Sequence, residues 1–121
     1  MKPYSLALLM VAGCAVGPQD RFEGLGSHTR KITTSSPEAQ DYFNQGLAFL
    51  YAFNHDEAIR SFARATELDP ACAMAHWGIS CANVPHINNP AVDEAHAKAA
   101  WAALTKAREN AASATPIEKA L

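Results

Sequence analysis

The sequence lacks a hydrophobic run long enough to cross a bilayer as a mature helix. The apolar stretch from Leu6 to Ala12 falls well short of the about 20 residues that a spanning helix needs. The lysines and arginines are scattered along the chain and the formal net charge is −2, so no clustered basic face indicates a nucleic-acid partner. Nothing resembles a nucleophile elbow, a phosphate-binding glycine loop or a paired acid–base set. We therefore expect neither an enzyme nor a nucleic-acid-binding protein, and no cofactor.

Cysteine is also scarce, with three residues in the chain. Cys72 and Cys81 are nine positions apart, so on one helix their Cα atoms would be about 13.5 Å apart. A disulfide tolerates less than about 7 Å. We therefore expect no bridge between them, and interpret both as small buried side chains rather than as a reactive pair.

The N-terminus has the form of a secretory signal. Lys2 precedes the apolar run, and Val11-Ala12-Gly13-Cys14 closes it. These four residues resemble the lipobox of bacterial lipoproteins, which implies cleavage before Cys14 and lipidation of its thiol. Ordinary secretion with cleavage after Gly17, or a chance apolar N-terminus, are the alternatives. Ala15 follows the cysteine, and the absence of aspartate there favours the outer membrane.

The rest of the chain predicts an all-α fold. Hydrophobic residues make up 49% and charged residues 18%, a balance typical of folded globular chains, and the many alanines favour helix. Residues 1–13 are then a signal peptide, 14–35 a tether and 36–121 a helical domain. Helix starts are predicted at Ser36-Pro37, at Asn54, near residue 71, at Asn89-Pro90 and at Thr115-Pro116. The corresponding helices run to about residues 53, 68, 84 and 112, and the fifth has barely begun at Leu121.

The segment from Ala39 to Cys72 matches the tetratricopeptide pattern of about 34 residues. The pattern asks for small residues where two antiparallel helices cross, aromatic residues between the helices, and a proline that ends the second helix. The matching residues are Tyr42, Gly46, Phe49, Ala58, Phe62, Ala65 and Pro70. One position departs, because Gln45 stands where leucine is expected.

A second, degenerate copy follows at about residues 73–114. Ala100, Leu104 and Ala107 repeat the spacing of Ala58, Phe62 and Ala65, each 42 positions later. The excess over the usual repeat length predicts an insertion between its two helices, at Pro85–Asn89. Such an insertion is either a lengthened connector or a binding loop.

More narrowly, the chain resembles a group of bacterial envelope tetratricopeptide proteins. The resemblance lies in these segments: Leu25–His28, Tyr51–Ala58, Asp69-Pro70, Cys72–Ala75, Trp77-Gly78 and Ile87–Pro90. It implies a helical array with further repeats downstream, so we expect this sequence to be an N-terminal piece of a longer protein. It implies no catalysis.

Two function hypotheses remain. The first is a lipid-anchored scaffold of the bacterial cell envelope that binds a protein or peptide on the inner face of the array. The residues predicted to point there are Gln40, Phe43, Leu47, Leu50 and Tyr51, although residues 27–34 or further repeats are alternative covers for that face. The second is a metal- or cofactor-binding envelope protein that uses His28, His55, His76 or His86. No histidine pair has zinc-type spacing on one helix, so the sequence itself predicts no metal ligand.

Overall fold

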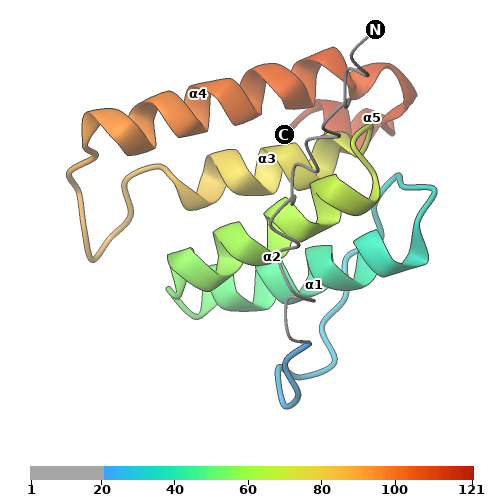
Figure 1. Cartoon of the computed structure of the whole chain (residues 1–121), viewed down its shortest axis with the longest axis horizontal. Coiled ribbons are helices and arrows are strands. Elements are labelled where there is room, and N and C mark those ends of the chain that lie inside the picture. The colour runs from blue at the N-terminus through green and yellow to red at the C-terminus, as the bar shows by residue number, and fades with distance from the viewer. Residues whose placement is uncertain (1–20) are drawn as a thin grey trace, which may run out of the picture.

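The computed structural model describes residues 21–121, which form five α-helices, a short 3-10 helix and no strand. The helices are α1 (Pro37–Tyr51), α2 (His55–Leu68), α3 (Ala73–Ala82), α4 (Glu94–Glu109) and α5 (Pro116–Lys119), with the 3-10 turn η1 (Ala111–Ser113) before α5. They lie in chain order, α1 packing on α2, α2 on α3 and α3 on α4 (Figure 1). The predicted all-α fold is confirmed for these residues, and the helices pack against one another in neighbouring pairs.

Side-chain caps start three of the five helices in residues 21–121 where the sequence indicated; α3 begins at Ala73 without a side-chain cap, and the start of α4 differs from the prediction. The side chain of Ser36 accepts a hydrogen bond from the backbone of Ala39, and that of Asn54 accepts one from Glu57. Thr115 and Glu118 form the complete reciprocal capping box. At Asn54 only half of the box forms, because the carboxylate of Glu57 pairs with Arg60 instead.

The start that differs is that of α4, which we predicted at Asn89-Pro90. That prediction is wrong: α4 begins four residues later, and the side chain of Asp93 caps it by accepting from the backbone of His96. The backbone of Asn89 is already used, because it exchanges two hydrogen bonds with the backbone of His86. The connector between α3 and α4 therefore spans residues 83–93, longer than predicted.

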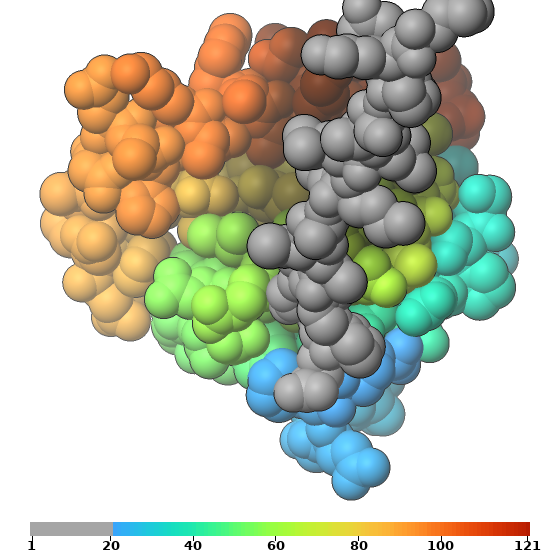
Figure 2. All heavy atoms as spheres, viewed as in Figure 1, coloured from blue at the N-terminus to red at the C-terminus, as the bar shows by residue number. Residues whose placement is uncertain are grey.

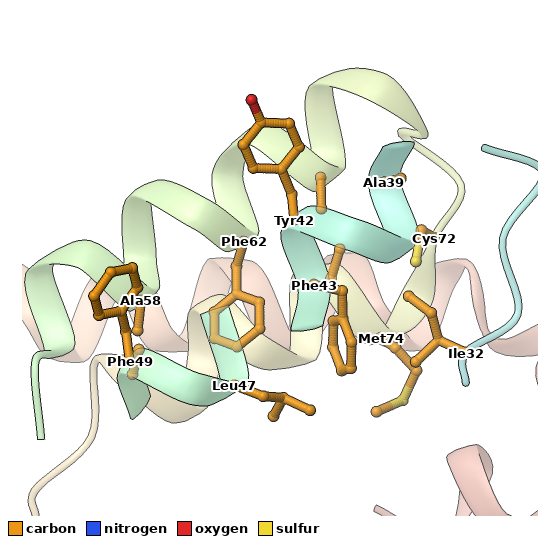
Figure 3. Close-up of a cluster of buried hydrophobic side chains, with 13 residues drawn as sticks. Ile32, Ala39, Tyr42, Phe43, Leu47, Phe49, Ala58, Phe62, Cys72 and Met74 are labelled. Atoms are coloured by element: carbon orange, nitrogen blue, oxygen red, sulfur yellow. The ribbon is translucent and has the colours of Figure 1, made fainter. Parts of the chain in front are cut away.

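The core lies between α1, α2 and α3 (Figure 3). Phe62 and Phe43 are fully buried, with ring centroids 5.4 Å apart. Glycine is required at two positions around Phe62, since a Cβ atom on Gly46 of α1 or on Gly78 of α3 would lie 2.6 Å from its ring. The two glycines therefore allow one large ring to fill the space between three helices.

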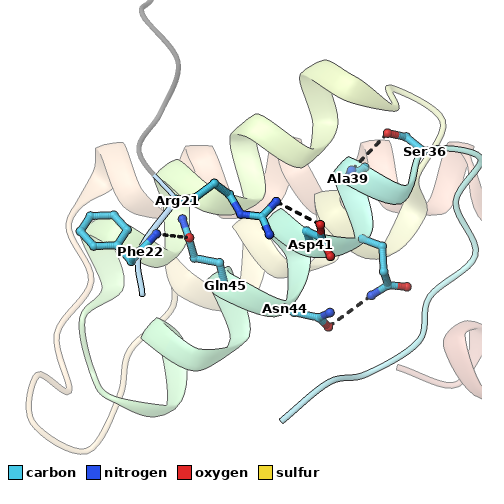
Figure 4. A network of polar contacts seen from close by, with 8 residues as sticks. Arg21, Phe22, Ser36, Ala39, Asp41, Asn44 and Gln45 are labelled. Atoms are coloured by element: carbon cyan, nitrogen blue, oxygen red, sulfur yellow. Dashed lines mark hydrogen bonds and ion pairs between the residues drawn. The ribbon is translucent and has the colours of Figure 1, made fainter. Parts of the chain in front are cut away.

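Residues 21–35, in the segment predicted as a tether, lie along α1 (Figure 1). Ile32 is buried in the core cluster and Leu25 packs against it. Figure 4 shows two of the polar contacts that hold this segment, Arg21 with Asp41 and the backbone of Phe22 with the side chain of Gln45. The segment is thus part of the folded unit from Arg21 onward.

Gln45, the one departure from the repeat pattern, has a structural reason. Its side chain is buried and its Nε2 donates to the hydroxyl of Ser61 on α2 at 3.1 Å. Its Oε1 accepts from the backbone of Phe22 at 3.0 Å. A leucine could make neither bond, so Gln45 links the N-terminal segment to both helices of the first hairpin.

The predicted signal peptide and the lipidation site at Cys14 lie outside the described residues. Within residues 21–121, no helix combines the length and the apolar character needed to cross a membrane. Cys72 and Cys81 are both free thiols, and Cys72 is fully buried.

Candidate functional site: the α3–α4 groove and the histidine pocket

The five residues predicted to form a partner-binding face lie in three different environments. Phe43 and Leu47 belong to the core, with exposures of 0% and 2%. Gln40 is occupied by the N-terminal segment, because its Oε1 accepts from the backbone of Ile32 and its Nε2 donates to the carbonyl of Arg30. The chain's own residues 30–32 therefore take the place that a peptide would take beside Gln40.

The remaining two residues lie at the end of α1. Leu50 is partly buried against the core, whereas Tyr51 is 69% exposed and touches the ring of His28 edge-on. The chain itself therefore covers Gln40, Phe43 and Leu47, as one of the alternatives for this face proposed. Tyr51 stays exposed to solvent.

A different apolar surface lies open on the second hairpin, in the groove between α3 and α4. It is a hollow of about 270 Å³ with these lining residues: Ser80, Asn83, Val84, Pro85, Val92, Ala97, Ala100, Trp101 and Leu104. Trp101 is 66% exposed, and Val84 and Val92 are more than 40% exposed. Tryptophan is enriched at protein interfaces and among the residues that contribute most to binding.

The groove continues past Leu104 towards the C-terminal end of α4. There a second hollow of about 240 Å³ lies between Trp77 and Leu104 on one side and residues 118–121 on the other. The short helix α5 follows at this end, with Ile117 exposed to 69% and Leu121 to 55%. This second hollow is of mixed character, because Arg108, Glu118 and Lys119 line it beside the apolar residues.

Three histidines meet at the opposite end of the molecule, in a pocket of about 360 Å³ between α2, the connector and α4. The rings of His55 and His86 are stacked, with centroids 3.9 Å apart and planes 13° apart. Phe53, which adopts a left-handed backbone with a φ of 59°, places its ring 6.4 Å from His55 and 6.3 Å from His86. This strained residue ends the α1–α2 turn, and its ring lies beside the stacked pair, tilted by 48° to His55 and by 45° to His86. We name this pocket the histidine pocket.

His96 lines the same pocket from the first turn of α4. Its Nδ1 lies 2.8 Å from Oδ2 of Asp93. The pKa of Asp93 is lowered, chiefly because its carboxylate accepts hydrogen bonds from the backbone and ring of His96. Asp56 and Asn89 complete the polar lining. Three histidines and two carboxylates therefore line one pocket.

The predicted histidine sites are only partly brought together. His76 bonds the carbonyl of Pro70 through Nε2 at the start of α3, so it does not face His86 beyond the other end of that helix. His28 is beside Tyr51. Across residues 21–121, no cluster of three or more His, Cys, Asp or Glu side chains has the geometry to hold a metal ion.

The repeat-signature residues do lie together, as the hairpin requires. Ala58, Phe62 and Ala65 are completely buried, and Tyr42 and Phe49 nearly so. Comparison with protein-family models, with curated proteins and with solved structures finds no match. The resemblance to tetratricopeptide proteins therefore stays a prediction that depends on these residues alone.

The sequence contains one signal for the groove, the tryptophan of α4. Trp101 lies in the apolar stripe of α4, between Ala100 and Leu104, but a tryptophan is too large for the small-residue contacts of a repeat. In the structure Ala100 is buried and Trp101 is not. The His55–His86 stack had no such signal, because it depends on the path of the connector.

Proposed function

We propose that this chain is a tetratricopeptide-type scaffold that binds an amphipathic helix of a partner protein in the α3–α4 groove. The observation that carries the proposal is the exposed indole of Trp101 at the edge of an apolar groove. In this view the chain does not transform its partner. It holds the partner, as helical-repeat proteins commonly do.

The repeat itself argues that the occupant is a helix. On the first hairpin, α3 lies on the ring of Phe62 and brings Gly78 against it. On the second hairpin, Leu104 takes the position of Phe62, with Ala100 and Ala107 in place of the two small residues. A helix placed on Leu104 as α3 is placed on Phe62 would run along the groove and cover Trp101. The first helix of a further repeat would take the same place, which is open within residues 21–121.

The location we propose is the bacterial cell envelope, with a lipid on Cys14 as the anchor. This follows from the lipobox-like sequence before Cys14 and from the resemblance to envelope proteins. The anchored end and the groove would then be at different parts of the chain, which leaves the groove free for a partner near the membrane surface.

The test uses residues 21–121 to select binders from a displayed library of 18-residue helical peptides, and fluorescence anisotropy to measure the selected peptides. We expect sequences with apolar residues at spacings of three and four, and a loss of about tenfold or more in affinity for Trp101→Ala. Tyr51→Ala is the matched control, since Tyr51 is equally exposed but lies on the face predicted from the sequence.

Three outcomes would overturn the proposal. One is that no helical peptide is selected, and another is that Tyr51→Ala abolishes binding while Trp101→Ala does not. The third is that the protein forms a dimer in sedimentation equilibrium that Trp101→Ala dissociates, because a second copy would then occupy the groove.

A further inference from the structure

The connector of residues 83–93 borders both sites. On one side His86 stacks on His55 of α2. On the other side Val84, Pro85 and Val92 form a wall of the α3–α4 groove beside Trp101. Asn83, Val84 and Val92 line both hollows. A movement of this connector therefore changes the histidine pocket and the groove together.

Ring contacts hold the connector to α2. Within residues 21–121, the hydrogen bonds of the connector run to α3, to α4 or between its own residues: Asn83 to Ile79, His86 with Asn89, Asn88 to His86, and Asp93 with His96 and Ala97. Ile87 at its tip is 85% exposed. Figure 2 shows the connector, in light orange, next to α2, in green. The stack of His86 on His55, with Phe53 beside it, is thus a ring contact that joins the connector to α2.

Stacked imidazoles tolerate one proton but resist two. Neutral rings stack well, and a singly protonated pair keeps an attraction between the cation and the neutral ring. Two imidazolium rings with centroids 3.9 Å apart repel each other. Imidazoles change charge between about pH 5 and pH 8, so acidification across this range acts directly on the stack.

The charges around the stack come from each element that faces it. Asp56 on α2 and Asp93 at the start of α4 supply negative charge, but Asp93 is already paired with His96. His55 stands in the first turn of α2, at the positive end of the helix dipole. Both carboxylates of the pocket therefore already interact with another cationic or ring group, Asp93 with His96 and Asp56 with Arg60.

We propose that the His55–His86 stack is a proton-operated latch that sets the shape of the α3–α4 groove. At neutral pH the stack holds the connector against α2 and keeps Val84 and Val92 in the groove wall. As the pH falls, the second proton opens the stack and frees the connector, and the groove loses that wall. The proposal rests on the proposed function, because the groove is the partner site whose occupancy the latch controls.

The experiment is a proton–nitrogen NMR titration of residues 21–121 from pH 7.5 to pH 5, without a partner. We expect the amide signals of Asn88, Asn89 and Val92 and the indole signal of Trp101 to shift together as the stack opens. His86→Phe keeps a ring on His55 that cannot take a proton, and should remove the shift at Val92 and Trp101. His96→Gln removes the third histidine of the pocket and should leave that shift in place.

The latch is overturned if the Trp101 and Val92 signals of the wild type do not move with pH. It is also overturned if they move equally in His86→Phe. A second measurement uses a peptide selected on the groove: its affinity should fall about fivefold or more from pH 7.5 to pH 5, and not in His86→Phe. Because the NMR shift needs no peptide, failure of the latch and failure of the groove as a partner site give different results.

Discussion

The ring of Phe62 and the backbone of Gly78 meet so closely that a Cβ atom on Gly78 would lie 2.6 Å from the ring. Gly46 approaches the same ring from α1 with the same clearance. Phe62 therefore sets the separation of three helices at once, and no side chain fits at either glycine without a shift of the ring. Since the ring is fully buried, it has little room to move.

Substitution of Gly78 by alanine should therefore destabilise the protein although alanine favours helix. The methyl group overpacks the core, at a cost of roughly 1–3 kcal/mol, and the gain in helix propensity offsets at most about 1 kcal/mol of it. We expect a lower urea midpoint with an unchanged slope. If Gly78→Ala leaves the unfolding free energy unchanged or raises it, Gly78 and the ring of Phe62 do not pack as closely as described.

The control for this prediction is a double-mutant cycle with Phe62→Leu. Leucine occupies the corresponding position of the second hairpin, at Leu104, and it is smaller than phenylalanine. We expect Phe62→Leu to cost less in the Gly78→Ala protein than in the wild type, by about 0.5 kcal/mol or more. Additive effects would show that the two residues do not compete for one space.

Asp69 should make stability depend on pH in the acid range. Its pKa is lowered chiefly by the hydrogen bond from the Thr34 hydroxyl, at 2.5 Å, and further by the backbone N–H groups of Ser35 and Ala71, while burial acts in the opposite direction. Because the folded pKa lies below the unfolded one, the stabilisation is complete above about pH 4 and is lost as the pH falls through the folded pKa.

Asp69→Asn should then cost about 1–3 kcal/mol at pH 7 and progressively less below pH 4, when Asp69 itself becomes protonated. Urea unfolding at pH 7 and pH 3 measures both values. Asp41→Asn is the matched control, since Asp41 is half exposed and pairs with Arg21 on the surface. A similar loss of unfolding free energy in both variants at pH 7 would show that the hydrogen bonds to buried Asp69 do not stabilise the fold.

Glu118 should stabilise the N-terminal segment from the far end of the chain. Burial of its carboxylate raises the pKa, but hydrogen bonds from the hydroxyl and N–H of Thr33 and the N–H of Thr115 outweigh burial and lower it. Each of these bonds is 2.7 Å long. Glu118→Gln replaces one of the two acceptor oxygens, so we expect a loss of about 1 kcal/mol in unfolding free energy.

The control for Glu118 is Glu109→Gln, which removes an exposed partner of Lys106 and should cost less than about 0.5 kcal/mol. Hydrogen exchange gives a second readout. The amide of Thr33 should exchange faster in Glu118→Gln and unchanged in Glu109→Gln. Equal exchange at Thr33 in both proteins would show that the contact does not order the segment.

Cys14→Ser tests the predicted anchor. If Cys14 carries a lipid, the full chain expressed in a bacterium should be found with the membranes, and the serine variant should be released into the soluble fraction, because a hydroxyl is not a substrate for thiol lipidation. Cys72→Ser is the control, since Cys72 is buried and has no part in anchoring. A serine variant that stays with the membranes contradicts the anchor.

Local signals in the sequence predicted most helix starts correctly. They did not predict which residues form the exposed surface available for binding. Ser36, Asn54 and Thr115 cap helices as predicted, because a cap depends on residues only three positions apart. The cap predicted at Asn89 does not form, because the backbone of Asn89 is hydrogen-bonded to that of His86. The side chain of Asp93 caps the helix instead. Ala100 and Ala107, which follow Ala58 and Ala65 by 42 positions, are buried like them.

The binding face could not be predicted from the repeat pattern alone. The pattern places Gln40 and Phe43 on an inner face, but it does not say that residues 30–32 of the same chain cover Gln40. The meeting of His55 and His86 likewise depends on where a connector of irregular backbone turns. Long-range contacts of this kind have no periodic signal along the chain.

The bond between Glu118 and Thr33 joins residues that are 85 positions apart. Arrays of helical hairpins are held by contacts between neighbouring units, so their ends can fray independently of one another. Here the segment before the first hairpin is bonded to the helix after the second. Local opening at one end is therefore coupled to the other, and the two hairpins should unfold as one cooperative unit rather than one after the other.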